Sequence, residues 1–358
     1  MGSGRLRAFR REDIPDVVAL RQQVFHFSER RSSSMLAEYF ERIFFHHPWP
    51  DEELHSWVHE DRRGRVTGFL GVLPRRMTWR GQPIRTAVST QLMVEPPSRG
   101  LVGLLLVRAF LAGPQDWSVS DTANDVARRI FESVGATTSM IHSLVWLRPL
   151  RPCRDLASRL AHGLVARVAL FAARPLVAAG DAFAARRAGG AARQPAGTIQ
   201  PLTPALMLAH LDVLGCRALR PAYEAGALEW LLEQVAEKRQ FGTLERALVR
   251  APSGEVAGWF LYFLNPGGAS QVVQLAARPA AQTLVLQHLF HHAWSRGAAA
   301  VAGRLEPALV SDLATLGCGF ARDGPWVLIH SRRPELMPAV ERGDALLSRL
   351  DGEWWLSF

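Results

Sequence analysis

The sequence has few cysteines, almost no lysine and no long uninterrupted apolar run. Its three cysteines, Cys153, Cys216 and Cys318, are scattered and odd in number. This pattern excludes a disulfide framework and a cysteine-based zinc site, and it favours a reducing cytosol. No apolar run reaches the roughly 18 residues of a membrane-spanning helix, and the N-terminus has no apolar signal region. We therefore expect a cytoplasmic protein.

Positive charge dominates the composition, with a net charge of +9 that arginine supplies almost alone. A basic surface suits a nucleic acid, an anionic membrane or a phosphorylated ligand, although an arginine-rich, GC-biased genome would produce the same charge. We expect no DNA partner, because a phosphate-bearing small ligand already accounts for a basic binding mouth. The 48% of apolar residues is too high for a disordered chain and typical of a globular protein.

The length of 358 residues favours two domains. In residues 1–150 the apolar periodicity and turn residues predict alternating elements. Strands are expected at 5–9, 54–60, 65–79, 84–94, 117–120 and 139–147, and helices at 14–25, 35–45, 100–111 and 122–134. This order is typical of a mixed α/β (α+β) domain with a central mixed sheet flanked by helices.

The second half repeats this order. Strands are expected at 198–202, 244–250, 256–264, 270–276, 299–304 and 319–329, and helices at 204–214, 228–237, 281–295 and 307–316. Residues 64–69 (GRVTGF) match 254–259 (GEVAGW), and residues 133–136 (SVGA) match 315–318 (TLGC). The internal likeness predicts two modules of one type, residues 1–150 and 197–332. A C-terminal helix and tail follow at 333–358.

Residues 151–196 interrupt the repeat with an Ala- and Arg-rich stretch that ends in a flexible joint. We expect a helical connector packed between the modules. Peripheral contact with a membrane through residues 160–185 is the alternative, because that segment is apolar but broken by charges.

Residues 94–106 (VEPPSRGLVGLLL) carry a family resemblance. They resemble the signature of the GNAT superfamily of N-acetyltransferases, in which a strand ends and a Gly-rich turn opens a helix that holds the pyrophosphate of coenzyme A. Residues 121–124 (DTAN) and 131–135 (FESVG) look like later steps of the same fold. The whole chain, with its ending LDGEWW at 350–355, is similar to tandem proteins of this superfamily.

The resemblance implies an acyl-CoA co-substrate, acetyl-CoA or a longer acyl-CoA, bound by the first module. Backbone N–H groups at a helix start are unpaired and attract phosphate, and glycine permits close approach. The implied cofactor-binding residues are Leu92, Met93, Val94, Arg99, Gly100, Leu101, Val102, Gly103 and Asn124. Pro97 and Val102 depart from the family pattern, and Gly103 stands one residue beyond the expected position. The matching stretch of the second module, residues 275–282, has no glycine, so we expect no coenzyme A there.

Direct attack by an acceptor amine needs a general base, an acid for the leaving thiolate and an oriented carbonyl. The resemblance places the thioester along residues 91–94, and it places Phe131 where many members carry a tyrosine acid. The candidate catalytic residues are Gln91, Glu95, His46, His47 and Ser133. His288, His291 and His292 have metal-compatible spacing, but without an acidic or cysteine ligand we expect a solvated helix face and no metal.

Three functions follow from these patterns. The first is an acyl-CoA-dependent N-acyltransferase that acts on an amine of a small metabolite, amino sugar or peptide. The second resembles the Fem-type ligases, which take aminoacyl groups from tRNA. It is the one hypothesis that includes a tRNA partner. The third is a degenerate, non-catalytic scaffold. For the first function we expect an acceptor pocket between the modules, near His46, His47 and Trp49.

Overall fold

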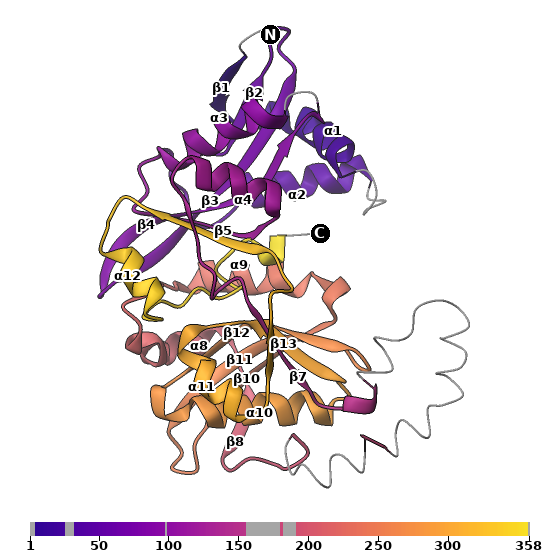
Figure 1. The fold of residues 1–358 in the computed structure, drawn as a ribbon, viewed down its shortest axis with the longest axis vertical. Helices are drawn as coiled ribbons and strands as arrows, with labels where there is room; N and C mark the ends of the chain where they lie inside the picture. Colours follow the sequence, from indigo (N-terminus) through magenta and orange to yellow (C-terminus); the bar gives the residue numbers. More distant parts are fainter. Residues whose placement is uncertain (1–3, 26–31, 97–98, 155–179, 182–190, 357–358) are drawn as a thin grey trace, which may run out of the picture.

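The computed structural model describes residues 4–25, 32–96, 99–154, 180–181 and 191–356. The chain forms two mixed sheets, one above the other along the long axis of the molecule, each flanked by helices (Figure 1). The prediction of a mixed α+β fold with a central sheet in each half is confirmed. Most of the expected connector lies outside the described residues, so the helix and the membrane contact over residues 160–185 stay predictions.

The first sheet is built around two long strands of the first half. Its order is β1 (Arg5–Ala8), β2 (Trp57–Glu60), β3 (Val66–Trp79), β4 (Gln82–Val94), β5 (Trp117–Ala123), β15 (Trp326–Ser331) and β6 (Thr137–Thr138). A short strand of the second half, β9 (Leu219–Pro221), pairs with the end of β3. Neighbouring strands are antiparallel except β4 and β5, which are parallel because α3 (Arg99–Leu111) connects them.

The second sheet repeats this plan. Its order is β14 (Gly319–Ala321), β7 (Val145–Pro149), β13 (Ala300–Arg304), β12 (Ala269–Ala277), β11 (Val256–Leu264), β10 (Thr243–Arg250) and β8 (Thr198–Pro201). Here β12 and β13 form the parallel pair, and α10 (Gln282–Ser295) connects them. The remaining helices of this half are α8 (Pro204–Ala209), α9 (Ala225–Ala236), α11 (Val310–Thr315) and α12 (Leu336–Glu341).

The two halves exchange strands, which the sequence analysis did not predict: β9 and β15 of the second half join the first sheet, and β7 of the first half joins the second. The strand expected over 139–147 has wrong bounds: residues 139–144 form no strand, β6 ends before them and stays in the first sheet, and β7 pairs with β13 and β14 in the second. The strand expected over 319–329 divides into β14 in the second sheet and β15 beside β5 in the first. The period-2 alternation of a strand is the same in either sheet, so the pattern identifies a strand but not its partner.

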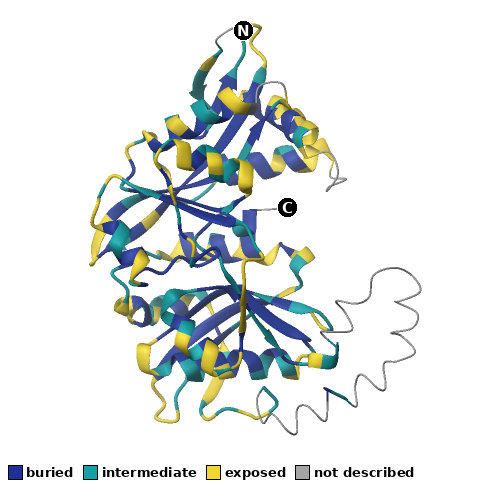
Figure 2. Cartoon of the chain, viewed as in Figure 1, coloured by how far each residue is buried: buried dark blue, intermediate teal, exposed yellow. Residues whose placement is uncertain are grey.

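The apolar cores also join the halves. On one face of the first sheet, α3 and α4 (Asp125–Ser133) pack in a core that includes Leu70, Val102 and Phe131. On the other face, α1 (Ile14–Val24) and α2 (Ser33–Phe45) share a core with the second half, in which Phe69, Leu228 and Trp355 are fully buried. Figure 2 shows this buried layer continuing from one sheet to the other. Among the described residues, no helix combines the length and the apolar character needed to cross a bilayer.

Candidate active site

The parallel strands β4 and β5 separate part-way along their length and leave a cavity. Their register runs only from Thr86 opposite Trp117 to Val88 opposite Val119. Beyond that point no strand of the described residues pairs with the facing edges, and a cavity of about 290 Å³ lies between them. Its walls come from β3, β4, β5, the end of α1, α4 and the C-terminal tail: Arg21, Phe25, Leu70, Ser89, Thr90, Gln91, Leu92, Ser120, Thr122, Ala123, Asn124, Ala127, Phe131, Glu353 and Leu356.

A bulge in β4 shapes one wall of this cavity. The register with β3 shifts between Phe69 and Gly71, so that Gln91 and Leu92 both lie opposite Leu70. Gln91 has a φ of 51°, which is rare for a residue with a side chain. Its amide Nε2 donates to the Tyr39 hydroxyl at 3.0 Å, whereas its Oε1 is buried without a partner. The bulge therefore interrupts the strand pairing beside the cavity, which Gln91 and Leu92 line.

Gly100, near the start of α3, has open space around it. Gly100 is exposed, and a Cβ built on it would meet no atom within 4 Å. Val102, a departure from the family pattern, is buried and packs against Gly68 of β3. Its bulk therefore points into the core. Gly103 faces Ile130 of α4, which a Cβ would approach to 3.2 Å, so this glycine lets the two helices pack closely.

The described residues bring some of the predicted cofactor residues to the cavity and place others in the core. Leu92 lines the cavity, and Met93 and Val94 are buried in the sheet beside it. Asn124 lines it too, and its Oδ1 accepts from the Ala127 N–H at 2.9 Å, which caps α4. Leu101 is exposed on α3.

Four of the predicted catalytic residues do not line the cavity. Glu95 lies beyond the end of β4, where its carboxylate is 3.9 Å from Arg65. Ser133 ends α4, and its hydroxyl donates to the Ile130 carbonyl at 2.7 Å. His46 is exposed at the end of α2 beside Arg11 and Glu41.

His47 is held in a structural contact rather than aimed at the cavity. It stacks on Trp49, and its Nδ1 accepts from the Trp49 N–H at 3.2 Å. Burial, together with the charge of Arg75, lowers the pKa of His47 to about 4. The ring is therefore neutral at pH 7. Trp49 itself lines a separate small cavity between the two halves.

The sequence analysis missed Glu353, the acidic residue that the tail inserts into the cavity wall. Its Oε1 accepts from the Ser120 hydroxyl at 2.7 Å and from the N–H groups of Asp121 and Thr122 at 3.1 Å each. Both N–H groups belong to β5. Burial, together with the nearby Asp121 carboxylate, raises the pKa of Glu353 to about 7. The one hint in the sequence was that an acidic residue stands among the aromatic residues of the C-terminal tail. The tail has neither the helical nor the strand periodicity that would indicate where this residue lies.

A buried ion pair fixes this part of the tail. Arg304 of β13 donates to Asp121 at 2.5 Å, and the other Asp121 oxygen accepts from the Glu353 N–H at 2.6 Å. A Cβ on Gly352 would lie 2.2 Å from Asp121 Oδ2. Only glycine therefore allows the tail to approach β5 closely enough for Glu353 to enter the wall.

The equivalent gap in the second sheet is filled by the protein's own side chains. The register of β12 with β13 ends at Gln271 opposite Ala302. Arg349 of the tail occupies this region and donates to the Gln271 side chain at 2.9 Å and to the Val272 carbonyl at 3.2 Å. The helix that follows β12 opens with Pro279, which has no N–H for a phosphate.

The three histidines of α10 have separate partners. His288 contacts the Ala196 carbonyl, His291 the Ala191 carbonyl and His292 the Tyr262 hydroxyl, each at 2.8–3.0 Å. Within the part of the chain that the structure describes, no cluster of three His, Cys, Asp or Glu side chains suits a metal ion.

Comparison with solved structures assigns the fold. A probable N-acyltransferase from Enterococcus faecalis V583 matches with a TM-score of 0.58 and 12% identity over 92% of this chain and 73% of that chain. The chain has the GNAT fold. A GCN5-related N-acetyltransferase from Anabaena variabilis matches with a TM-score of 0.57 and 13% identity, over 92% of this chain and 73% of that chain. Saccharomyces cerevisiae N-myristoyltransferase with bound myristoyl-CoA matches with a TM-score of 0.51 and 11% identity, over 92% of this chain and 78% of that chain. No protein-family model and no curated protein sequence matches this chain.

Proposed function

We propose that this GNAT-fold chain is an acyl-CoA-dependent N-acyltransferase whose donor thioester lies in the cavity between β4 and β5. The separation of these strands around the Gln91 bulge carries the proposal, because it combines a roomy cavity with unpaired backbone edges. Fold alone does not fix function. The similar structures, two acyl- or acetyltransferases and one enzyme with bound myristoyl-CoA, support the same class.

The residues of the cavity, together with the start of α3 outside its lining, fit such a donor. The open start of α3 at Gly100 suits the pyrophosphate. The bulged edge of β4 suits the pantetheine amides, and its N–H groups would polarise the thioester carbonyl. The apolar walls at Leu70, Phe131 and Leu356 suit an acyl chain.

Glu353 is the residue that we assign as general base. An incoming ammonium must lose a proton before its nitrogen attacks the carbonyl carbon, and a base with a pKa near the working pH serves best. Glu353 lines the cavity and has a pKa of about 7. As the C–N bond forms and the C–S bond breaks, the leaving thiolate takes its proton from water, since Phe131 has none to donate.

Thermal-shift titration with acetyl-CoA, longer acyl-CoAs and free coenzyme A tests this function, because a ligand that binds only the native state raises Tm. Gly100→Glu should abolish the increase by placing charge and bulk at the pyrophosphate, while its fold is kept because nothing crowds the position. Met140→Glu adds the same charge at an exposed apolar site outside the cavity and should respond like the unmodified protein. If no acyl-CoA and no free coenzyme A raises Tm, the hypothesis of a non-catalytic scaffold is favoured instead.

A further inference from the structure

A buried ion pair between the two halves stands directly behind Glu353. Arg304 ends β13 of the second half, and Asp121 belongs to β5 of the first. The Arg304 Nη2 donates to Asp121 Oδ2 at 2.5 Å and to the Asp121 main-chain carbonyl at 3.1 Å. Its Nη1 donates to the Leu347 carbonyl of the C-terminal tail at 3.2 Å. One guanidinium therefore joins the second sheet, the first sheet and the tail.

Asp121 and Glu353 bind each other reciprocally. Asp121 Oδ1 accepts from the Glu353 N–H at 2.6 Å, and Glu353 Oε1 accepts from the Asp121 N–H at 3.1 Å. Because Arg304 holds the other oxygen of the Asp121 carboxylate, rotation of this side chain would break the contacts on both sides. The place of Glu353 in the cavity wall therefore depends on Arg304, although the two residues share no printed contact of their own.

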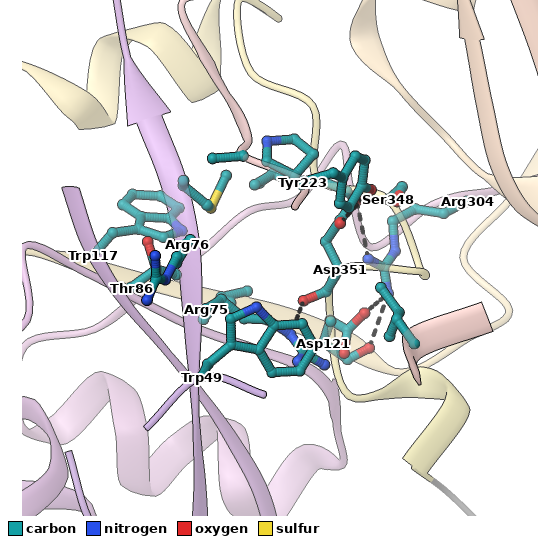
Figure 3. Close-up of a pocket in the computed structure, with 17 residues that line it drawn as sticks. Trp49, Arg75, Arg76, Thr86, Trp117, Asp121, Tyr223, Arg304, Ser348 and Asp351 are labelled. Atoms are coloured by element: carbon teal, nitrogen blue, oxygen red, sulfur yellow. Dashed lines mark hydrogen bonds and ion pairs between the residues drawn. The ribbon is translucent and has the colours of Figure 1, made fainter. Parts of the chain in front are cut away.

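The ion pair lies behind the wall of the cavity between β4 and β5. Successive side chains of a strand point to opposite faces. Ser120 and Thr122 line that cavity, whereas Asp121 meets Arg304 on the other face, at the small cavity between the halves (Figure 3). Asp121 and Arg304 are 0% and 9% exposed. A ligand between β4 and β5 therefore meets Glu353 but not the pair that holds it.

The pair also sets the electrostatic surroundings of Glu353. Burial, together with the Asp121 carboxylate, raises the pKa of Glu353 to about 7. Arg304 neutralises that carboxylate in a place where water and salt screen little. Removing the charge of Asp121 should therefore lower the pKa of Glu353. Removing Arg304 alone should raise it, because an unneutralised carboxylate then remains beside Glu353.

Arg21 and Tyr39 approach Glu353 from the helices. Arg21 of α1 lines the same cavity, and a guanidinium stays protonated near pH 7. Tyr39 of α2 lies near enough for the Glu353 charge to act on it, but burial is the main reason why the pKa of Tyr39 is raised. Its hydroxyl is therefore neutral at pH 7. Neither group changes its charge in the range in which Glu353 titrates.

Arg349 and Glu306 lie near Arg304. Burial, together with the charge of Arg304, lowers the pKa of Arg349 to about 9, so this residue of the tail is charged at pH 7. Burial raises the pKa of Glu306 to about 7, and its carboxylate lies 4.0 Å from His142. Burial lowers the pKa of His142 to about 3, so the ring is neutral. Glu306 therefore titrates in the same range as Glu353 and needs a separate assignment.

We propose that Arg304, a residue of the second half, is a positioning residue for acyl transfer in the first half. Through Asp121 it holds the Glu353 carboxylate against β5 and keeps a neutralised carboxylate behind it. This role rests on the proposed function, in which Glu353 takes the proton of the incoming ammonium. The second half then takes part in the reaction, although Arg349 fills the gap in its own sheet.

Two variants of the ion pair separate this role from simple stabilisation. In Asp121→Asn, Glu353 should titrate at least about 1 pH unit lower than in the wild type. In Arg304→Met it should titrate higher. A loosened wall would instead expose Glu353 to water and lower its pKa in both variants. NMR signals of the glutamate carboxyl carbons follow the titration, and Glu353→Gln distinguishes the signal of Glu353 from that of Glu306.

Kinetics provide the second readout. Asp121→Asn and Arg304→Met should each lower kcat roughly 10–100-fold, because a small misplacement of a reacting group costs about that much. The Kd of acyl-CoA in isothermal titration should stay that of the wild type, since neither residue lines the cavity. Arg304→Lys keeps the charge and should keep the wild-type midpoint. Arg296→Met, which removes an exposed ion pair with Glu245, is the control and should match the wild type throughout.

A double variant covers the case in which Arg304→Met does not fold. Asp121→Asn combined with Arg304→Met leaves no unpaired buried charge of this pair. Glu353 should titrate lower in the single variant Asp121→Asn than in the double variant, because only the single variant keeps the Arg304 charge. The same midpoint in both would show that Arg304 does not act on Glu353.

Other results also overturn the role of Arg304. These are a lower midpoint in both single variants, an unchanged midpoint in both, a shifted midpoint in Arg304→Lys, or loss of acyl-CoA binding together with kcat. Failure of the proposed function would look different, since the wild type would then show no turnover. The NMR midpoints of the variants would still support or contradict the link from Arg304 to Glu353.

Discussion

Glu353 accepts a hydrogen bond from the Ser120 hydroxyl at 2.7 Å, across a sequence separation of 233 residues. The contact closes the cavity between β4 and β5 with a residue that follows the whole second half of the chain. The C-terminal tail is therefore part of the first module's site, and the two halves form one unit around it. The shared core and the exchanged strands β7 and β15 also indicate that the two halves form one unit.

Glu353→Gln should lower kcat by about 10²–10⁴-fold, the range for loss of a general base, without changing acyl-CoA affinity. The amide keeps an oxygen for Ser120, so the fold should survive. The wild-type kcat/KM should rise with pH through about 7 as the raised pKa of Glu353 is passed, and the variant should lack this rise. Glu335→Gln, at an exposed residue paired with Arg333, is the control. A wild-type rate and pH profile in Glu353→Gln would remove Glu353 from the mechanism.

Isothermal titration should give one acyl-CoA site per chain. The cavity of the first sheet is open, whereas Arg349 fills the corresponding gap of the second sheet and Pro279 stands at its helix start. A stoichiometry of two would show that the gap in the second sheet also binds acyl-CoA, and it would contradict the predicted difference between the two sheets.

The exchanged strands predict that the halves do not fold separately. Residues 1–150 alone lack β15, which lies between β5 and β6, so circular dichroism should show no cooperative unfolding transition. In contrast, the full chain cut once within residues 182–190 should elute as one particle on size exclusion, because each half still supplies a strand to the other sheet. Independent folding of residues 1–150, or separation of the cut halves without denaturant, would contradict the exchange.

The sequence predicted the fold class because helices and strands leave local periods. It also predicted that residues 91–94 and 100–103 lie at the end of β4 and the start of α3, because a strand followed by a Gly-containing helix start is a local signal. It did not predict the partners of β7 and β15, since pairing depends on contacts across the whole chain. Glu353 was missed for the same reason: its role depends on the edge of β5, and nothing near it in the sequence indicates that edge.

The most direct test of the central claim is acyl-CoA binding to a variant with the cavity filled. Ala127 of α4 lines the cavity, and its neighbour Val126 is 55% exposed and does not. Ala127→Trp should abolish binding of acetyl-CoA and longer acyl-CoAs in isothermal titration, and Val126→Trp should bind like the wild type, both with unchanged circular dichroism. Wild-type affinity in Ala127→Trp, or no binding by the unmodified protein, would contradict the account.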